Sequence, residues 1–149
     1  MRGFEKVSSK INDSDVVIPS RSTKGSAGYD FVSPINIEIS PKESFSVKTG
    51  IKAYMLMDEC LFIYPRSSIG IKHGIMLKNT IGVVDSDYYN NEDNEGEIIV
   101  SLYNYSDKIF SFKKGERFCQ GIFQKVLFSE HENDDQINSR KGGIGSTGN

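Results

Sequence analysis

The sequence contains no tryptophan, only two cysteines and no long apolar segment. Cys60 and Cys119 lie far apart and belong to no Cys-x-x-Cys pair, so we expect two reduced, buried thiols instead of a disulfide framework or a zinc site. Because no run of about 18 apolar residues is present, no transmembrane helix is predicted. The first residues lack the apolar core of a signal peptide. We therefore expect a cytoplasmic protein.

An excess of basic charge is also missing. Lysine and arginine number 18 against 20 aspartate and glutamate residues, and the net charge is -2 with a pI near 5.7. Proteins that bind the nucleic-acid backbone usually carry a basic surface, so we expect no nucleic-acid partner, and no membrane partner either. With 149 residues, 37% of them hydrophobic, the composition predicts one globular domain.

The regular alternation of apolar and polar residues predicts β-strands. Ile35, Ile37 and Ile39 alternate with polar residues, and the segments 97–112 and 116–128 are long runs rich in Ile, Val, Phe and Tyr. Turn signals such as Ser-Pro, Thr-Gly and Lys-Gly separate the runs. This spacing predicts an all-β sandwich or barrel. At most one short helix is expected, at residues 67–73, where a central glycine weakens the prediction.

The last ten residues, RKGGIGSTGN, contain four glycines, so we divide the chain into a β domain, residues 1–139, and a mobile tail, residues 140–149. Residues 143–148 match the pattern G-x-G-x-x-G, but a dinucleotide site needs that motif to open a helix after a strand, and this context is missing. Glycines still let backbone N–H groups approach an anion, and Arg140 or Lys141 suits that role. The alternative is a flexible tail without function.

Six acidic residues and no basic one lie between residues 85 and 97. A calcium loop of the EF-hand type would need a glutamate where Leu102 stands, and helices on both sides, so we do not predict one. Asp85 ends an apolar strand and is a candidate general base; its alternative is a turn-capping aspartate. The acids nearer the tip of the segment are expected to lie in a solvated loop: Glu92, Asp93 and Glu95.

Two further segments suggest an anion site. Arg66 precedes Ser67 and Ser68, and its planar fork of donors matches phosphate oxygens, while the serines can complete an anion nest. The alternative is a surface turn. Gln120 interrupts an apolar run; it needs a partner if buried, or faces solvent on an edge strand.

Taken in order, five segments resemble the motifs of the trimeric dUTPase (deoxyuridine triphosphatase) family. They are residues 26–31, 65–68, 82–88 with 96–98, 115–120 and 142–148. The resemblance implies a jelly-roll subunit in a homotrimer, with active sites shared between subunits and closed by the tail of a third subunit. The implied reaction converts dUTP and water to dUMP and pyrophosphate, with Mg²⁺ on the triphosphate. It keeps dUTP out of DNA and supplies dUMP for dTMP synthesis.

The resemblance also implies roles for single residues. Asp85 resembles the carboxylate that deprotonates the water attacking the α-phosphorus, and Tyr88 resembles the ring that packs under the deoxyribose and excludes a 2′-hydroxyl. Asn79, with the backbone around Gly82 and Val84, is similar to the uracil-reading hairpin. The implied phosphate ligands are Arg66, Ser67, Ser68 and Gln120, with Arg140 or Lys141 for the γ-phosphate. The other substrate-binding residues implied in the tail are Ile144, as an aliphatic cover over uracil, and Gly145, Ser146 and Thr147.

For the metal, the resemblance implies a site without direct protein ligands. Mg²⁺ would be held by phosphate oxygens and water, as is usual for this ion. Asp30 matches the carboxylate of the first motif, which organises the site and contacts the metal through water.

The chain departs from the family pattern in three places. Ile144 stands where the family usually has a phenylalanine that stacks on uracil. Arg140 is four residues before that position, where the family arginine is commonly five before it. Residues 89–94 are an insertion beside the implied site.

Two rival functions remain from the sequence. A dCTP deaminase shares the fold and similar motifs, but it requires a catalytic glutamate placed for attack on cytosine. A regulatory protein on a dUTPase scaffold is the other rival, and its protein partner would bind the acidic insertion at residues 89–95.

Overall fold

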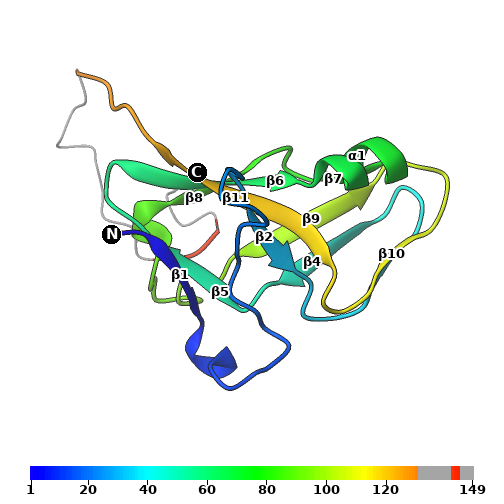
Figure 1. Ribbon diagram of the computed structural model, residues 1–149, viewed down its shortest axis with the longest axis horizontal. Helices are drawn as coiled ribbons and strands as arrows, with labels where there is room; N and C mark the ends of the chain where they lie inside the picture. The colour runs from blue at the N-terminus through cyan, green and yellow to red at the C-terminus, as the bar shows by residue number, and fades with distance from the viewer. Residues whose placement is uncertain (131–141, 145–149) are drawn as a thin grey trace.

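The computed structural model describes residues 1–130 and 142–144 (Figure 1). Within them the chain is built from short strands, one α-helix and two 3₁₀ turns, η1 (Ser8–Lys10) and η2 (Ser86–Tyr88). The helix, α1, spans Ser67–His73. The strands are β1 (Gly3–Lys6), β2 (Tyr29–Val32), β3 (Ile37–Ile39), β4 (Ser44–Lys48), β5 (Ile51–Tyr54), β6 (Glu59–Pro65), β7 (Ile75–Leu77), β8 (Gly82–Asp85), β9 (Ile99–Asn104), β10 (Phe110–Phe112) and β11 (Arg117–Lys125).

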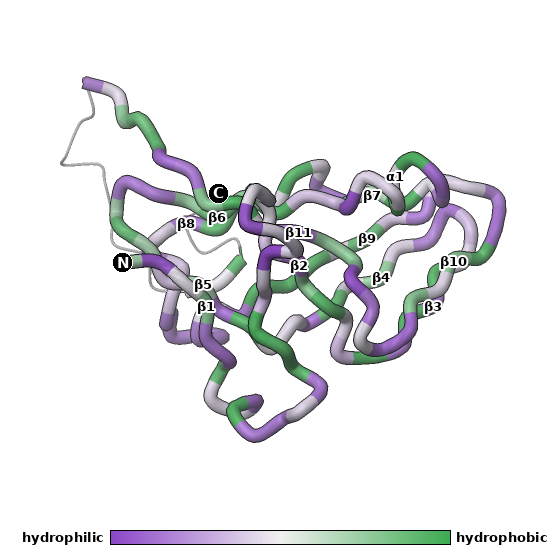
Figure 2. The backbone as a smooth tube through the Cα atoms, in the orientation of Figure 1, coloured by the Kyte–Doolittle hydropathy of each residue, from purple (hydrophilic) through white to green (hydrophobic). Residues whose placement is uncertain are grey.

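The strands form antiparallel sheets that enclose one core. A four-stranded sheet has the order β2-β11-β6-β8, and a three-stranded sheet has the order β4-β9-β7; the pairs β1-β5 and β10-β3 complete the structure. The core joins side chains from both larger sheets, including Phe31 and Leu61 from the first, and Val47 and Leu102 from the second. The tube in Figure 2 shows apolar segments running along these strands. The predicted all-β, jelly-roll-like sandwich is confirmed.

The alternation seen in the sequence follows the burial of the side chains. Strand β9 alternates between half-buried and buried residues along its whole length, and Ile37 and Ile39 of β3 are both buried. Ile35 differs from the prediction, because it precedes β3 and is exposed. The alternation of side chains between the two faces of a sheet continues only as long as the chain is paired in that sheet. Ile35 lies before the paired segment, so the alternation does not place it on the core face.

The predicted helix at residues 67–73 forms despite its central glycine. Ile69 is buried on its inner face, and this packing offsets the low helix propensity of Gly70. The helix ends at Gly74, whose φ of 69° is left-handed and whose N–H donates to the carbonyl of Gly70 at 3.2 Å.

Both thiols are free and buried, as predicted. Burial raises the pKa of Cys119 well above its usual value, and the charge of Asp30 adds to this effect, so the thiol is kept in its unreactive, protonated form. Within the described part of the chain, no helix has the length and apolar character needed to cross a membrane.

Glu59, at the start of β6, is a buried carboxylate held by the N-terminal segment. It accepts hydrogen bonds from Arg2 Nε at 3.0 Å and from the backbone N–H of Leu56 at 3.1 Å. The Arg2 guanidinium is the main cause that lowers the pKa of Glu59 from 4.5 to about 2. This pair fastens the chain before β1 to the central sheet.

We expect the Arg2–Glu59 pair to make folding stability sensitive to acid. The folded-state pKa is depressed, so the stabilisation is complete above pH 4.5 and is lost as the pH falls toward about 2. Arg2→Ala should lower the thermal midpoint at neutral pH and flatten its decline in this window, as measured by circular dichroism. Lys125→Ala, which removes an exposed ion pair with Asp58, is the control and should change little. An acid profile identical in parent and Arg2→Ala would contradict this account.

Candidate active site

A mostly apolar pocket of about 260 Å³ lies between the β8 edge of the four-stranded sheet and strands β7 and β9. Its walls include Ile63, Leu77, Ile98 and Val100, which also belong to the core. The pocket brings together six of the residues predicted for the site: Asn79, Gly82, Val84, Asp85, Tyr88 and Ile144. We call it the nucleoside pocket below, after the uracil and deoxyribose contacts that the resemblance implies for these residues.

Strand β8 can offer backbone groups to a ligand in this pocket. Within the described residues it is the last strand of its sheet, paired only with β6. The outer edge of such a strand presents N–H and C=O groups that another chain or a ligand can pair with. Asn79 lies in the turn before β8, where its carbonyl accepts the N–H of Ile81 at 2.7 Å. A planar base with its own donors and acceptors matches this edge.

Asp85 is the last residue of β8 and lies at the rim of the nucleoside pocket. It is opposite Cys60 of β6 in the strand register, and its side chain is exposed. Asp85 also precedes η2, yet it makes no side-chain capping hydrogen bond to that turn. The arrangement therefore does not favour the turn-capping alternative, and it places a carboxylate beside an apolar cavity at the end of a fixed strand.

Tyr88 is a buried wall of the same pocket. Its hydroxyl donates to the carbonyl of Glu97 at 3.1 Å and accepts a hydrogen bond from Asn94 Nδ2 at 2.8 Å. The ring is therefore held by Asn94, near the end of the 89–95 loop, and by Glu97, which follows the loop. Sequence reasoning gave Asn94 no role, since nothing in its local pattern indicates that the loop folds back onto Tyr88.

The expectation of a solvated loop agrees with the exposure of Glu92 and Asp93, but Asp93 and Glu95 also make hydrogen bonds to distant parts of the chain. Glu95 accepts hydrogen bonds from the backbone N–H of Ser8 at 3.1 Å and from the Ser8 hydroxyl, and these bonds lower its pKa. Asp93 accepts a hydrogen bond from the N–H of Gly143 at 2.7 Å. This loop is held by contacts between residues that lie more than forty positions apart in the sequence, and no local pattern encodes such contacts.

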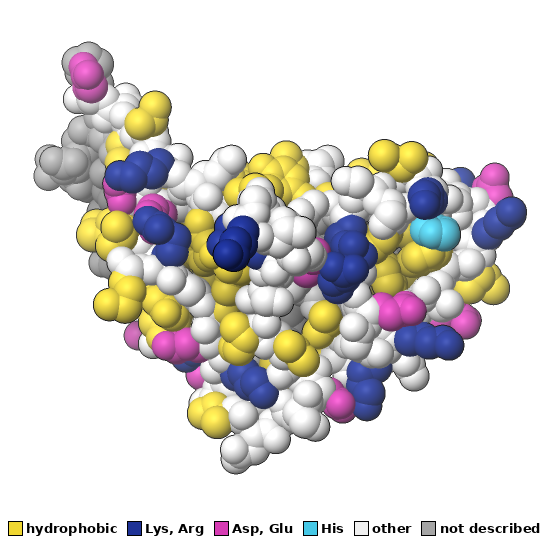
Figure 3. All heavy atoms as spheres, in the orientation of Figure 1, with side chains coloured by type: hydrophobic (Ala, Val, Ile, Leu, Met, Phe, Trp, Pro, Cys, Tyr) yellow, Lys and Arg dark blue, Asp and Glu magenta, His cyan; other side chains and the backbone are white. Residues whose placement is uncertain are grey.

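A second pocket, of about 490 Å³, lies over β2 and β11 next to the start of α1. Five predicted site residues line it: Asp30, Arg66, Ser67, Ser68 and Gln120. Figure 3 shows basic side chains on the face over β2 and β11. We call this the anion pocket. Within the described residues it shares no lining residue with the nucleoside pocket.

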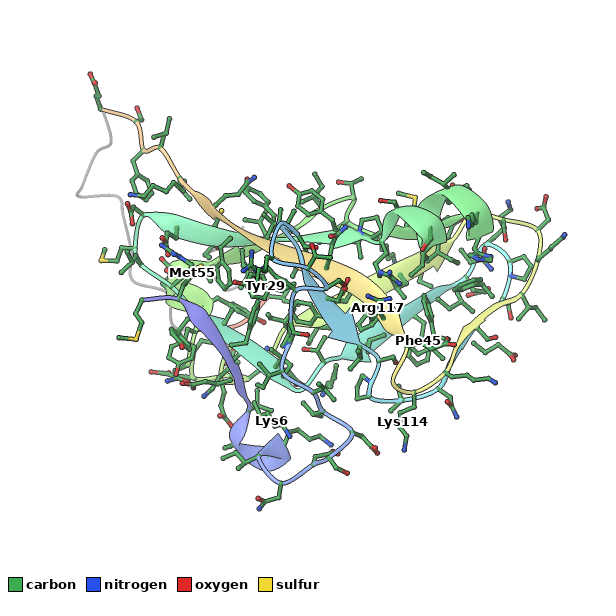
Figure 4. The ribbon with its side chains drawn as sticks, viewed as in Figure 1. Lys6, Tyr29, Phe45, Met55, Lys114 and Arg117 are labelled. Carbon is green, nitrogen blue, oxygen red and sulfur yellow. The ribbon has the colours of Figure 1, made fainter. Side chains whose placement is uncertain are left out.

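Asp30 is the centre of a charged network in the anion pocket. Its carboxylate lies 3.5 Å from Arg66 Nε and accepts hydrogen bonds from Arg117 Nη1 at 3.1 Å and from the Ser22 hydroxyl at 2.6 Å. Arg117 is at the start of β11, beside β2 (labelled in Figure 4). Sequence analysis assigned no role to Arg117 or Ser22, although Arg117 lies inside the fourth motif. The carboxylate holds Arg66, which lines the anion pocket, and Arg117, which lies beside that pocket, and two guanidinium groups so placed favour anion binding.

Gln120 is half-buried, so neither alternative for it applies fully. Its Nε2 donates to the carbonyl of Pro65 at 3.4 Å, and its amide lies so close to Gly28 that a Cβ there would clash with Oε1. Gly28 therefore gives the Gln120 side chain its place in the pocket. Within the first motif, Gly28 leaves space for this side chain and Asp30 contributes charge.

Other predicted site residues fall outside the described part of the chain: Arg140, Lys141, Gly145, Ser146 and Thr147. The proposed domain boundary at residues 139 and 140 lies there too. Among residues 1–130 and 142–144, no group of three or more His, Cys, Asp or Glu side chains is arranged to hold a metal ion.

Comparison with known proteins gives a consistent result. A family model described as dUTPase matches residues 14–148. The chain is 43% identical over 148 residues to the deoxyuridine 5'-triphosphate nucleotidohydrolase of Lactococcus lactis subsp. lactis (strain IL1403), covering 99% of this chain and 98% of that protein. It is similar to the crystal structure of dUTPase from Streptococcus mutans, with a TM-score of 0.77 and 40% identity, covering 86% of this chain and 98% of the other. The dUTPase from phage phi11 of S. aureus has a TM-score of 0.73 over 93% of this chain and 99% of its own, at 15% identity, which shows the fold alone.

Proposed function

The chain belongs to the dUTPase family, and from this premise we propose that it hydrolyses dUTP to dUMP and pyrophosphate. The nucleoside pocket is the observation that carries the proposal. It combines an apolar cavity, the open edge of β8, the buried ring of Tyr88 and the carboxylate of Asp85. In the cell, this reaction would keep dUTP out of DNA and supply dUMP, and we place it in the cytoplasm.

We infer the mechanism from the position of each group and from the family resemblance. Uracil pairs with the outer edge of β8 and with Asn79, and the deoxyribose packs on Tyr88, where a 2′-hydroxyl finds no room. Asp85 accepts a proton from the water that attacks the α-phosphorus, and the bond from the α-phosphorus to the oxygen bridging to the β-phosphate breaks. Positioned general bases of this kind contribute about 10²–10⁴-fold.

The anion pocket supplies the phosphate ligands. Arg66, Ser67, Ser68 and Gln120 face one cavity, and donors held in place before the reaction stabilise the charge that develops in the transition state. Asp30 fixes Arg66 in this pocket and Arg117 beside it by ion pairs. It is therefore a positioning residue for the guanidinium groups.

The donor set of the anion pocket fits a metal that arrives with the triphosphate. Its one carboxylate, Asp30, is already paired with Arg66 and Arg117, so direct coordination by the protein has little support, while a contact through water is compatible. Bound Mg²⁺ would neutralise charge on the phosphate oxygens. The residues of the chain orient and neutralise the remaining phosphate charge.

The positions of the two pockets support shared sites in a homotrimer. Ile63 of β6 lines the nucleoside pocket and pairs with Gly121 of β11. Gln120 is next to Gly121, so it points to the opposite face of the sheet, where it lines the anion pocket. The two pockets share no lining residue among those described, and we infer that a neighbouring subunit's anion pocket completes each site. In the trimer, the tail closing each site would come from a third subunit.

A nucleotide panel tests the proposed reaction. With Mg²⁺ present, we expect pyrophosphate release from dUTP and little activity on dCTP, dTTP or UTP, since β8 and Tyr88 discriminate against other bases and against ribose. Pyrophosphate and ammonia are measured in parallel. Ammonia released from dCTP would instead identify a deaminase of the same fold, and a protein inert toward all four nucleotides would overturn the proposal.

A further inference from the structure

The loop of residues 89–95 begins and ends at the Tyr88 main chain. Asn90 N–H donates to the carbonyl of Glu95 at 3.0 Å, and Glu95 N–H donates to that of Asn91 at 3.1 Å. Gly96, with a φ of 81°, lies so close that a Cβ would come within 2.6 Å of the Tyr88 carbonyl oxygen. The loop is therefore a closed structure attached to the wall of the nucleoside pocket.

Two asparagines of the loop hold Tyr88. Asn91 is buried, and its Nδ2 donates to the Tyr88 carbonyl at 2.8 Å. Asn94 donates from Nδ2 to the Tyr88 hydroxyl at 2.8 Å, while its Oδ1 accepts from Asn91 Nδ2 at 2.8 Å and from the N–H of Gly96 at 3.0 Å. The main chain and the hydroxyl of Tyr88 are thus fixed by one connected set of amides.

The neighbouring residue, Asp93, holds the C-terminal segment. Its Oδ2 accepts the N–H of Gly143 at 2.7 Å, and Gly143 lies against the Asn94 amide, because an added Cβ would be 3.7 Å from its atoms. The next residue, Ile144, lines the nucleoside pocket although most of its side chain is exposed. An aliphatic side chain with so little burial contributes little to holding the segment in place, whereas Asp93 binds the main chain of the segment directly.

The opposite side of the loop is fixed to the β domain. Lys52 of β5 is buried and donates from Nζ to Asn90 Oδ1 at 2.6 Å, with Glu95 Oε2 at 3.5 Å and the Tyr89 ring centroid at 5.1 Å. Because the loop is attached to a core strand, the positions of Asp93 and Asn94 are set by the fold.

We propose that the 89–95 loop is a positioning element of the nucleoside pocket, in which Asp93 seats the C-terminal segment and Asn94 fixes the Tyr88 ring. This inference rests on the proposed dUTP hydrolysis for its catalytic consequence. The contact lies within one chain here, and in the proposed trimer Asp93 receives the same backbone N–H from another subunit's tail. Loss of Asp93 then weakens closure, and loss of the Asn94 donor loosens the sugar-binding wall.

Asp93→Ala tests the seat of the tail, with Glu92→Ala, a change at the exposed neighbouring acid, as the matched control. We expect kcat/KM for dUTP to fall about tenfold in Asp93→Ala, because a charge-assisted hydrogen bond is lost, with an unchanged thermal midpoint. In a chain lacking residues 142–149, Asp93→Ala should have no further effect on binding of a non-hydrolysable dUTP analogue. The role of Asp93 would be overturned if Asp93→Ala weakened binding of the analogue equally with and without the tail. It would also be overturned if kcat/KM fell no further in Asp93→Ala than in Glu92→Ala.

Asn94→Asp tests the hold on Tyr88. The variant keeps an acceptor for the Gly96 N–H but removes the donor to the Tyr88 hydroxyl. We expect the preference for dUTP over UTP, as a ratio of kcat/KM values, to fall several-fold, and Tyr88→Phe to give the same fall without adding to it. Unchanged selectivity in Asn94→Asp would show that Asn94 stabilises the loop alone.

A fluorescence measurement separates this inference from the proposed reaction. The chain has no tryptophan, so Ile144→Trp introduces a single reporter in the C-terminal segment. We expect the fluorescence anisotropy of this variant to fall when Asp93→Ala is added, and not when Glu92→Ala is added, with no nucleotide present, because the segment released from Asp93 moves more freely. Identical anisotropies would refute the seat even if dUTP is hydrolysed; a fall would support it even if dUTP is not.

Discussion

Asp85→Asn is expected to lower turnover of dUTP by about 10²–10⁴-fold, the contribution of a positioned general base, while nucleotide binding is kept. The amide has nearly the same shape as the carboxylate, so the rim of the nucleoside pocket is preserved, but it cannot take the proton of the attacking water. kcat is measured at saturating dUTP, and affinity is measured by calorimetry with a non-hydrolysable analogue.

Asp87→Asn is the matched control for this loss. Asp87 is an exposed acid in η2, two residues further along the chain, and does not line the nucleoside pocket. We expect its replacement to change turnover only slightly. If Asp85→Asn turns over dUTP at the parental rate, then another group is the base.

Removal of residues 142–149 is the second change with a large expected effect. We expect kcat/KM for dUTP to fall by at least about a hundredfold, comparable to the loss of a single preorganised donor at a reacting centre, because the cover at Ile144 and the glycine-rich N–H groups are lost together. Stability should change little, since Ile144 is 78% exposed. Activity assays and circular dichroism melts are compared with a chain lacking only Asn149. A large drop in the thermal midpoint would show that the tail is part of the folded core.

Local patterns in the sequence predicted the β-rich fold and several of its strands, while the resemblance to the dUTPase family supplied most of the residues of the two pockets. Alternation predicted β9, and packing of Ile69 explains why the helix at Ser67–His73 forms in spite of its glycine. The strand end at Asp85 was visible as an apolar run followed by a charge. Such patterns report which face of a segment is buried, and this information is local.

The networks around the pockets could not be predicted, because they join segments that are distant in the sequence. Asp30 and Arg117 are 87 residues apart and meet through the pairing of β2 with β11. Asp93 looked like one of several solvated acids, and its partner, Gly143, is 50 residues away. A carboxylate gives no local sign of the backbone group it will bind; only the register of the sheets and the course of the loop decide it.

The meeting of the two ends of the 89–95 loop, where Gly96 touches the Tyr88 carbonyl, has a consequence for how such chains diversify. A segment that leaves and re-enters the fold at one point can gain or lose residues without displacing the strands on either side, and each doubling of its length costs only about 0.6 kcal/mol of closure entropy. Tyr88 is therefore next to a natural point of insertion. Evolution, or an engineer, can vary the surface beside the pocket there while the catalytic strand stays in register.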